Sequence, residues 1–412
     1  MPSGHSSPIV CDGRLYLTSF DNYSLKTHAF DAESGRELWH RDVSRTRSAK
    51  HHSLNNAASP SPVCDSGGVV VFFADFGLAA YAPDGERQWA SPQPPVVNNH
   101  GLASSPILSG KNVIQVVAGN SGSTVLAVAR STGKQVWKAP LAGVTYSTPI
   151  TGSDRQIVIL STGELVAFDA TSGERRWWVN QIPYQPKSSP VYSSRDKTIY
   201  FAALSVGEDS RAQLSSFEKL LTAFDVNKDG QITLEEMKER KGPAGAFAQI
   251  DLNGDGVFTR TEQEELMKIA DIPHVVAAVS AAGAGDMSTK LKWVHRKGVP
   301  NVASPLLMGG VLYLIKEGGI VTTLRPADGS VGYEGRLEAA FGALYSSPVG
   351  VGENLYIASQ QGKVFVLKAG LHWEILAVND IAEDCYATPA LVGDRLFLRT
   401  ASHLWCFRNS PL

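Results

Sequence analysis

A Ser-Pro or Thr-Pro step followed by a short apolar run occurs eight times along this chain of 412 residues. The prolines of these steps are Pro8, Pro62, Pro106, Pro149, Pro190, Pro305, Pro348 and Pro389. Their intervals are 54, 44, 43, 41, 115, 43 and 41 residues. A unit of about 42 residues is therefore repeated, with a small insertion after the first unit and one of about 73 residues inside the fifth.

Each unit predicts four short strands. In the first unit an apolar strand follows Pro8, a turn falls at Asp12-Gly13, and two more strands and a Ser-Gly turn precede Trp39. Segments such as LVAFDA (165–170) are short, rich in β-forming residues and bounded by glycine turns, which favours strands over helices. A period of 40 to 50 residues is typical of propellers. We therefore predict an all-β fold, an eight-bladed β-propeller of four-stranded antiparallel blades.

Most units end in a tryptophan, which we expect to pack between blades because large aromatic rings contribute much of the buried area in such cores. These residues are Trp39, Trp89, Trp137, Trp177, Trp293 and Trp373. The units resemble the repeats of the pyrroloquinoline-quinone-like (PQQ-like) propeller superfamily, whose signature is Ala-x-Asp-x-x-Thr/Ser-Gly-x-x-x-Trp. The match is close at 29–39 and 167–177 and looser at 127–137, and Tyr333 stands in place of Trp in the sixth unit.

The eighth unit contains material for only three strands. The resemblance implies that such propellers borrow the last strand from the N-terminus, since an unpaired edge promotes aggregation. We expect the eighth blade to lack one strand in this chain, and a Trp-containing strand and an export signal to be encoded upstream of Met1.

Two segments inside the fifth unit match the EF-hand calcium loop. In 225–236 the ligand candidates are Asp225, Asn227, Asp229, the Gln231 carbonyl, Thr233 and Glu236. In 251–262 they are Asp251, Asn253, Asp255, the Val257 carbonyl, Thr259 and Glu262. Calcium prefers six to eight oxygen ligands, the Gly at position 6 permits the turn, and the last Glu supplies two oxygens. We predict two Ca²⁺ sites, paired through Ile232 and Phe258, with a structural or a regulatory role; the lack of Met-rich flanks favours the structural one.

The insert divides the chain into three parts: residues 1–204 for the first propeller part, 205–274 for the EF-hand pair, and 275–412 for the rest of the fifth blade and the last three. It replaces the turn between the second and third strands of the fifth blade. Because strand direction alternates, that turn lies on the same face as the crossovers between blades. The long crossover 44–58, which contains His51 and His52, shares this face, and we interpret its histidines as solvated rather than metal-binding.

The residues just before each Ser/Thr-Pro step should surround the axial funnel on this face. They include Ala103 and Val302, and the polar candidates are His5, Tyr146, Lys187, Tyr345 and Tyr386. They predict a pocket for a polar small molecule or a protein segment. The alternative is that they plug the channel through mutual hydrogen bonds.

Charge and cysteine content narrow the class of protein. The formal net charge is −2 with both signs interspersed, which argues against nucleic-acid binding, and no apolar run is long enough to span a membrane. None of the four cysteines forms a CxxC pair, so we expect buried free thiols rather than a zinc site or disulfides. They are Cys11, Cys64, Cys385 and Cys406.

These observations favour a calcium-binding, non-enzymatic scaffold outside the cytoplasm, periplasmic or secreted. The resemblance extends to the propeller lipoprotein of the bacterial outer-membrane assembly machine. The alternative is a PQQ-dependent alcohol or sugar dehydrogenase, but the Asp base, the calcium ligands and the adjacent cysteines of that class have no counterparts here, so PQQ is not expected. A hydrolase or lyase is a third possibility, supported only by histidines on one face: His5, His51, His52 and His100.

Overall fold

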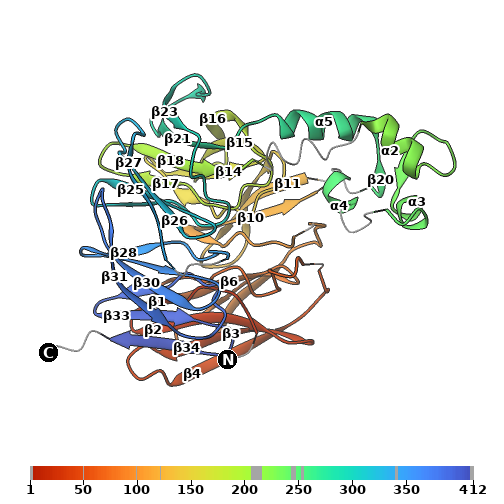
Figure 1. Cartoon of the computed structure of the whole chain (residues 1–412). Helices are drawn as coiled ribbons and strands as arrows, with labels where there is room; N and C mark the ends of the chain where they lie inside the picture. Colours follow the sequence, from red (N-terminus) through yellow and green to blue (C-terminus); the bar gives the residue numbers. More distant parts are fainter. Residues whose placement is uncertain are drawn as a thin grey trace.

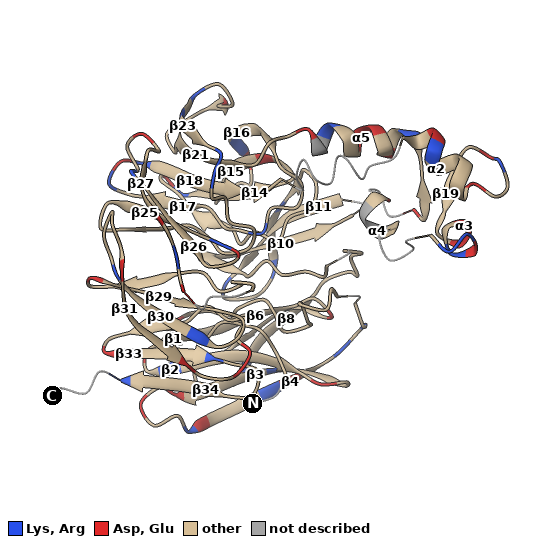
Figure 2. Ribbon diagram, viewed as in Figure 1, with Lys and Arg blue, Asp and Glu red and all other residues tan. Residues whose placement is uncertain are grey.

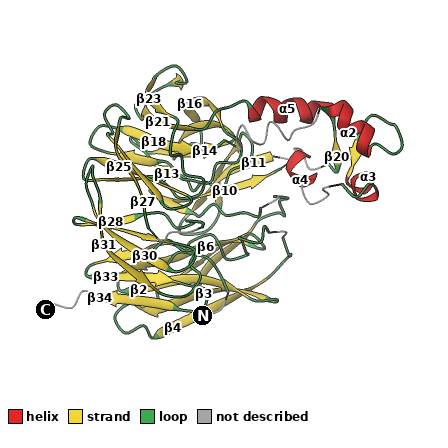
Figure 3. Ribbon diagram, viewed as in Figure 1, coloured by secondary structure: helices red, strands yellow, loops and turns green. Residues whose placement is uncertain are grey.

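The computed structural model describes residues 3–49, 51–98, 100–120, 122–205, 216–242, 247–251, 255–338 and 342–408. Its strands form eight antiparallel sheets that follow one another around a ring, as predicted (Figure 1). Within the described residues the helices are confined to a segment that projects to one side of the ring (Figure 3). None of these helices is long and apolar enough to cross a membrane.

The first four blades each begin with a short strand after the repeated proline. Blade one contains β1 (Ile9–Cys11), β2 (Arg14–Phe20), β3 (Ser24–Asp31) and β4 (Glu37–Ser44). Blade two contains β5 (Val63–Asp65), β6 (Gly68–Phe73), β7 (Gly77–Tyr81) and β8 (Arg87–Pro92). Blade three contains β9 (Ile107–Ser109), β10 (Asn112–Gly119), β11 (Gly122–Ala129) and β12 (Gln135–Leu141). Blade four contains β13 (Ile150–Thr151), β14 (Gln156–Ser161), β15 (Gly163–Asp169) and β16 (Arg175–Ile182).

The last four blades complete the ring. Blade five contains β17 (Val191–Ser193), β18 (Thr198–Ala203), β21 (Val275–Ser280) and β23 (Leu291–His295), and β22 (Gly285–Asp286) pairs in parallel with β16. Blade six contains β24 (Leu306–Met308), β25 (Val311–Lys316), β26 (Ile320–Leu324) and β27 (Val331–Arg336). Blade seven contains β28 (Val349–Val351), β29 (Asn354–Ala358), β30 (Lys363–Lys368) and β31 (Glu374–Asp380). Blade eight has three described strands, as predicted: β32 (Ala390–Val392), β33 (Arg395–Arg399) and β34 (Leu404–Arg408).

The hydroxyl of the repeated Ser/Thr-Pro step joins each blade to the one before it. The Ser7 backbone N–H donates to Ser61 Oγ at 2.9 Å, and the same bond recurs between every pair of consecutive steps. The further acceptors, in order, are the hydroxyls of Ser105, Thr148, Ser189, Ser304, Ser347, Thr388 and finally Ser7, at 2.9 to 3.1 Å. These eight bonds form a closed circuit around the axis, which explains why a hydroxyl residue precedes each proline.

In blades one to five the closing tryptophan packs against the following blade. In four blades the indole N–H donates to a turn carbonyl of the following blade. The pairs are Trp39–Pro83 (2.9 Å), Trp89–Arg130 (2.8 Å), Trp137–Ala170 (3.0 Å) and Trp293–Pro326 (2.8 Å). In blade four the fully buried Trp177 donates instead to Gln156 Oε1 at 3.1 Å.

The sixth and seventh blades depart from this pattern. Tyr333 lies opposite Thr323, the register position that Trp occupies in earlier blades, as predicted. Trp373 packs between blades six and seven, as predicted, and its indole N–H donates to the Val321 carbonyl at 3.3 Å. It does not hold the predicted closing position, because Ala377 lies there, opposite Val366. Trp373 lies before the strand and packs backward on Tyr333, with 5.4 Å between ring centroids.

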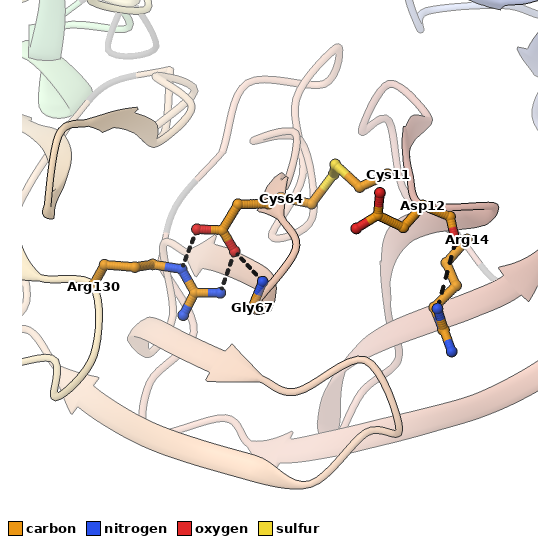
Figure 4. Close-up of a disulfide and its surroundings, with 7 residues drawn as sticks. Cys11, Asp12, Arg14, Cys64, Gly67 and Arg130 are labelled. Carbon is orange, nitrogen blue, oxygen red and sulfur yellow. Dashed lines mark hydrogen bonds and ion pairs between the residues drawn. A yellow bond between two sulfur atoms is a disulfide. The ribbon is translucent and has the colours of Figure 1, made fainter.

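Cys11 and Cys64 form a disulfide between β1 and β5, with Cα atoms 6.1 Å apart (Figure 4). The expectation of four free thiols is therefore wrong for this pair. Each cysteine lies two or three residues after the proline of consecutive units, so neighbouring inner strands bring them together. The expectation of a buried thiol holds for Cys385, whereas Cys406 is exposed.

The insert lies between two strands that pair directly. The register places Ala203 opposite Val275, so blade five remains intact around it. Its elements are α2 (Phe217–Phe224), β19 (Ile232–Thr233), α3 (Leu234–Glu239), α4 (Phe247–Ile250), β20 (Val257–Phe258) and α5 (Arg260–Ala270). As predicted, Ile232 pairs with Phe258 between the two loops. The insert projects on the side where the loops after β4 and β8 also lie (Figure 1).

Candidate functional site

A pocket with a volume of about 530 Å³ opens at the axis of the propeller. Its walls come from the segments that precede the inner strands, because these segments converge where the blades meet. All five predicted polar residues line it: His5, Tyr146, Lys187, Tyr345 and Tyr386. Ala103 and Val302 line it as well. These residues surround an open cavity.

One wall of the pocket is a stack of three rings. His5 stacks on Tyr386 with centroids 4.2 Å apart, and Tyr386 stacks on Tyr345 at 5.6 Å. Burial and then the Arg399 charge lower the pKa of His5 to about 4, against a hydrogen bond to the Leu54 backbone that raises it. His5 is therefore neutral at pH 7, and this wall presents flat aromatic faces without charge.

The opposite wall contains a histidine that the sequence prediction did not place in the pocket. His100 Nδ1 lies 3.0 Å from the Tyr146 hydroxyl, which donates to Asn98 Oδ1 at 3.0 Å. Burial, followed by the charges of Lys187 and His52, lowers the pKa of His100 to about 4. Asn98 Oδ1 also accepts the His100 backbone N–H, and the turn-forming residues Asn98 and Gly101 were the sequence signal that could have identified it.

The pocket offers hydrogen-bond donors and one ammonium group. Lys187 Nζ donates to Asn301 Oδ1 at 3.2 Å, and burial lowers the pKa of Lys187 while Glu317 raises it. The eight hydroxyl residues of the repeated step also line the cavity: Ser7, Ser61, Ser105, Thr148, Ser189, Ser304, Ser347 and Thr388. No Asp or Glu occurs among the described lining residues. This arrangement suits a ligand rich in hydrogen-bond acceptors.

Of the two other histidines of the predicted set, one lines the pocket and one lies beside it. His52 lines it, with its ring 5.2 Å from that of His100. His51 is half-buried, and its Nε2 lies 4.0 Å from Asp75 Oδ1. Within the described part of the chain, no group of three or more His, Cys, Asp or Glu residues is arranged to hold a metal ion.

The first EF-hand loop is closed by hydrogen bonds from its backbone to its own carboxylates. Asp225 accepts the Lys228 and Gly230 N–H groups at 2.7 and 3.0 Å. Glu236 accepts the Val226 N–H at 3.1 Å. It also accepts the N–H of Thr233, the N-cap residue of α3, at 2.9 Å, and the two residues form a capping box. The hydrogen bond from the Thr233 N–H contributes most to lowering the pKa of Glu236. Asp229 accepts the Gln231 N–H at 2.9 Å and Asn227 Nδ2 at the same distance.

The second loop repeats this arrangement where it is described. Asp251 accepts the Gly256 N–H at 3.0 Å, and Asp255 accepts the Val257 N–H at 2.8 Å. Glu262 accepts the Thr259 N–H and hydroxyl at 2.8 and 2.9 Å. Asn253 lies outside the described residues.

The residues of both loops fit calcium in their chemistry. Each loop carries carboxylates at the ligand positions of its sequence, where they accept backbone hydrogen bonds and do not form a preassembled metal group in the described residues. Each sixth position is a glycine in the left-handed region, with φ of 83° at Gly230 and 86° at Gly256. Oxygen-only donors of this kind suit a hard cation. Glu236, Asp251 and Glu262 are 5 to 7% exposed, so three of the carboxylates are largely removed from water.

Comparisons with known proteins agree with both parts of the chain. A family model described as outer membrane protein assembly factor BamB matches residues 2–177, 77–216 and 286–410. An EF-hand model matches residues 217–239 and 244–262. The outer membrane protein assembly factor BamB of Burkholderia pseudomallei (strain K96243) is 24% identical over 369 residues, 87% of this chain and 83% of that protein. The protein of the same name from Moranella endobia (strain PCIT) is 22% identical over 402 residues, 96% of this chain and 82% of that protein.

Solved structures share the propeller fold at low identity. The crystal structure of BamB from Moraxella catarrhalis has a TM-score of 0.62 and 13% identity, covering 98% of this chain and 95% of that chain. Sqt1 from Saccharomyces cerevisiae has a TM-score of 0.62 and 8% identity, covering 99% of this chain and 100% of that chain. These two similarities describe architecture alone.

Proposed function

The chain belongs to the family of the outer membrane protein assembly factor BamB, and we propose that it is a non-enzymatic, calcium-binding scaffold that acts outside the cytoplasm in protein assembly. The observation that carries this proposal is the axial pocket, which offers aromatic faces, hydroxyl groups and Lys187 but no carboxylate among its described lining residues. We propose that it receives a protein segment or a polar small molecule. The names of the two relatives support an assembly role.

Calcium binding is the second part of the proposal. Asp225, Asp229, Glu236 and the corresponding residues of the second loop would hold one Ca²⁺ each, and the ion would fix the loops and so the helices that flank them. Both loops match the full ligand pattern and pair through Ile232 and Phe258, which supports a compact two-site module.

The location outside the cytoplasm is supported by the disulfide between Cys11 and Cys64. Disulfides persist in oxidising compartments and are rare in the cytosol. Extracellular and periplasmic fluids also supply calcium steadily, which suits a structural EF-hand pair.

The pocket is tested in the source organism by deleting the gene and measuring the amounts of folded outer-membrane proteins. We expect these amounts to fall and to be restored by the original chain but not by Lys187→Met, which removes the pocket's ammonium group. The matched control is Lys290→Met, because Lys290 is an exposed lysine outside the pocket. Full restoration by Lys187→Met would refute the pocket's role.

The non-enzymatic assignment has a separate test. Pyrroloquinoline quinone and calcium are added to the purified protein, and the absorption spectrum and dye reduction with alcohols are recorded. We expect neither a bound quinone band nor dye reduction. A bound quinone that is reduced by alcohols would replace the proposal with a dehydrogenase.

A further inference from the structure

The eight hydroxyl residues of the repeated step have their oxygens engaged but not their hydrogens. Each oxygen accepts a backbone N–H from the neighbouring step, at 2.9 to 3.1 Å. A hydroxyl can also donate one hydrogen bond, but none of these eight O–H groups has an acceptor among the described residues. All eight residues line the axial pocket and remain partly exposed there. The pocket is therefore surrounded by hydroxyl groups that can donate to a ligand.

The serine just before the step hydroxyl has the opposite arrangement. In blades five and seven these serines are Ser188 and Ser346, which are 1% and 0% exposed. The Ser188 hydroxyl donates to the Ala202 carbonyl at 2.5 Å, and the Ser346 hydroxyl donates to the Ala358 carbonyl at 2.6 Å. Both carbonyls belong to the second strand of the same blade. One hydroxyl of each pair thus stabilises its own blade, whereas the next one faces the cavity.

Side-chain oxygens elsewhere in the pocket wall are also engaged as acceptors. Asn55 Oδ1 accepts the Asn56 N–H at 2.8 Å, and Asn301 Oδ1 accepts Lys187 Nζ at 3.2 Å. No carboxylate occurs among the described lining residues. A cation needs free acceptor oxygens, whereas an oxyanion needs donors. The balance of donors and acceptors in this pocket therefore favours an oxyanion.

The charge of the ligand follows from Lys187. Its ammonium group has three donors, and the side-chain carbonyl of Asn301 uses one of them. Glu317 acts on Lys187 through its charge, but no ion pair joins the two residues in the described part of the chain. A single ammonium with a carboxylate in its vicinity balances one negative charge, and burying further charges without partners is costly. The pocket therefore suits a carboxylate with one charge, and not a phosphate dianion or a polycarboxylate.

The rest of the ligand has a place on the aromatic wall. Lys187 precedes the step of blade five and His5 precedes the step of blade one, so they stand on opposite sides of a ring of eight blades. His5, Tyr386 and Tyr345 come from consecutive blades and stack on one another. A carboxylate bound at Lys187 therefore has uncharged ring faces across the pocket for the apolar part of its molecule.

We propose that the axial pocket binds a singly charged carboxylate, which accepts hydrogen bonds from the Lys187 ammonium and from the step hydroxyls of Ser189 and Ser304. These two hydroxyls are chosen because Lys187 and its partner Asn301 lie just before their steps. The assignment rests on the function proposed above for the pocket and names the chemistry of its ligand. A small organic acid and a polypeptide both carry this group, and separate probes distinguish the two sources.

A matched pair of probes tests the charge. The purified chain is titrated into 4-fluorophenylacetate and, separately, into 4-fluorophenylacetamide, and fluorine NMR line widths report binding. We expect saturable binding of the acid and at least about tenfold weaker binding of the amide, because the amide lacks the charge that strengthens hydrogen bonds from an ammonium group. Equal binding of acid and amide, or no saturable binding of the acid, would overturn the proposal.

Variants of the chain locate the site. Lys187→Met should weaken binding of the acid at least about tenfold and leave the amide unchanged, whereas the control Lys290→Met should bind both probes as the original chain does. Ser304→Ala should weaken the acid more than the amide, by about threefold, and Ser304→Thr should not. Tryptophan fluorescence shows that the variants fold. Undiminished binding of the acid by Lys187→Met would refute the assigned site.

Peptide probes distinguish the two sources of the carboxylate. N-acetyl-trialanine, as the free acid and as the amide, is used to displace 4-fluorophenylacetate. Tighter binding of the peptide acid than of 4-fluorophenylacetate would identify a polypeptide as the source, and weaker binding would identify a small organic acid. Equal displacement by the peptide acid and the peptide amide would show recognition of the backbone alone and would overturn the proposal.

The outcome for the carboxylate is separable from the outcome for the assembly role. If Lys187→Met fails to restore outer-membrane proteins in the deletion strain while acid and amide bind equally, the pocket's role stands and the carboxylate falls. If Lys187→Met restores them fully but loses the acid, the carboxylate site stands and the pocket's role in assembly falls.

Discussion

In the propeller, hydrogen bonds and tryptophan rings join each blade to its neighbour, whereas in the insert the carboxylates of each loop mainly accept hydrogen bonds from their own loop. The circuit of hydroxyl bonds runs around the whole ring and returns from Thr388 to Ser7. Within the described residues, the buried core of the insert is made of insert residues alone. They are Phe217, Ile232, Met237, Phe247, Phe258 and Leu266. The two regions should therefore respond to different perturbations.

The charges show the same contrast. Figure 2 shows acidic and basic residues scattered along the ribbon of the propeller, mainly on loops and strand ends, and more closely spaced on the insert. Three carboxylates of the insert are nearly buried, which is costly unless a cation or hydrogen bonds compensate them. We expect a cation to affect the order of the loops and not the packing of the blades. All eight tryptophans lie outside residues 205–274, so their fluorescence reports on the propeller, and the helical circular dichroism reports on the insert.

The largest effect should come from removing the disulfide. Cys11 and Cys64 close a loop with a sequence separation of 53, so replacing both by serine should destabilise the propeller by about 4 kcal/mol through the freedom gained by the unfolded chain. Urea unfolding followed by tryptophan fluorescence measures this change. Calcium titration by calorimetry should remain unchanged in this variant. A shift in the calcium affinity would show that the two regions are coupled.

Calcium removal should affect only the insert. With calcium a hundredfold above the dissociation constant, binding should stabilise the module by roughly 2.7 kcal/mol, and a chelator should lower the melting temperature of the helices by the corresponding amount. Glu236→Gln with Glu262→Gln should abolish both sites in calorimetry. The control is Glu235→Gln with Glu264→Gln, which changes exposed glutamates outside the ligand positions. An unchanged tryptophan signal is expected throughout, and a change there would contradict the separation of the regions.

Acid should act on the propeller through His5. Its folded-state pKa of about 4 lies below the ordinary value of 6.5, so the unfolded chain binds more protons between these two pH values. Stability therefore falls as pH falls from about 6.5 to about 4, by about 3 kcal/mol from this residue. His5→Phe keeps a ring against Tyr386 and should make the urea midpoint less dependent on pH in this window. An equally steep pH dependence in His5→Phe would assign the effect to other groups.

Periodic features of the sequence predict the fold well, because each blade repeats one pattern of strands and turns. The EF-hand pairing of Ile232 with Phe258 follows in the same way from loop spacing. Features that depend on a contact between units were missed. Cys11 and Cys64 are far apart in sequence, and their contact depends on the distance between inner strands of neighbouring blades. The closing position was wrongly given to Trp373 because the register of the last strand of blade seven places Ala377 there, and composition does not show strand register.

The axial pocket was predicted in part for a similar reason. Position before the repeated step pointed to His5 and Tyr386, which line the pocket, but their stacking depends on side-chain directions that only the packed ring defines. His100 belongs to a crossover loop of blade three, where no repeat pattern marks it. The hydroxyls of the repeat were visible in the sequence, but their role as acceptors between blades appears only when the ring is closed.

The smallest effect should come from one link of this hydroxyl circuit. Ser105→Ala removes the acceptor for the Ser61 N–H, a bond of 2.9 Å, and should destabilise the propeller by about 1 kcal/mol. Ser105→Thr should cost much less, because Thr148 and Thr388 perform the same role in their own blades. Urea unfolding followed by tryptophan fluorescence separates the two variants. If Ser105→Ala and Ser105→Thr were equally stable, the recurrence of hydroxyl residues before each proline would need another cause, such as the donors they present to a ligand in the pocket.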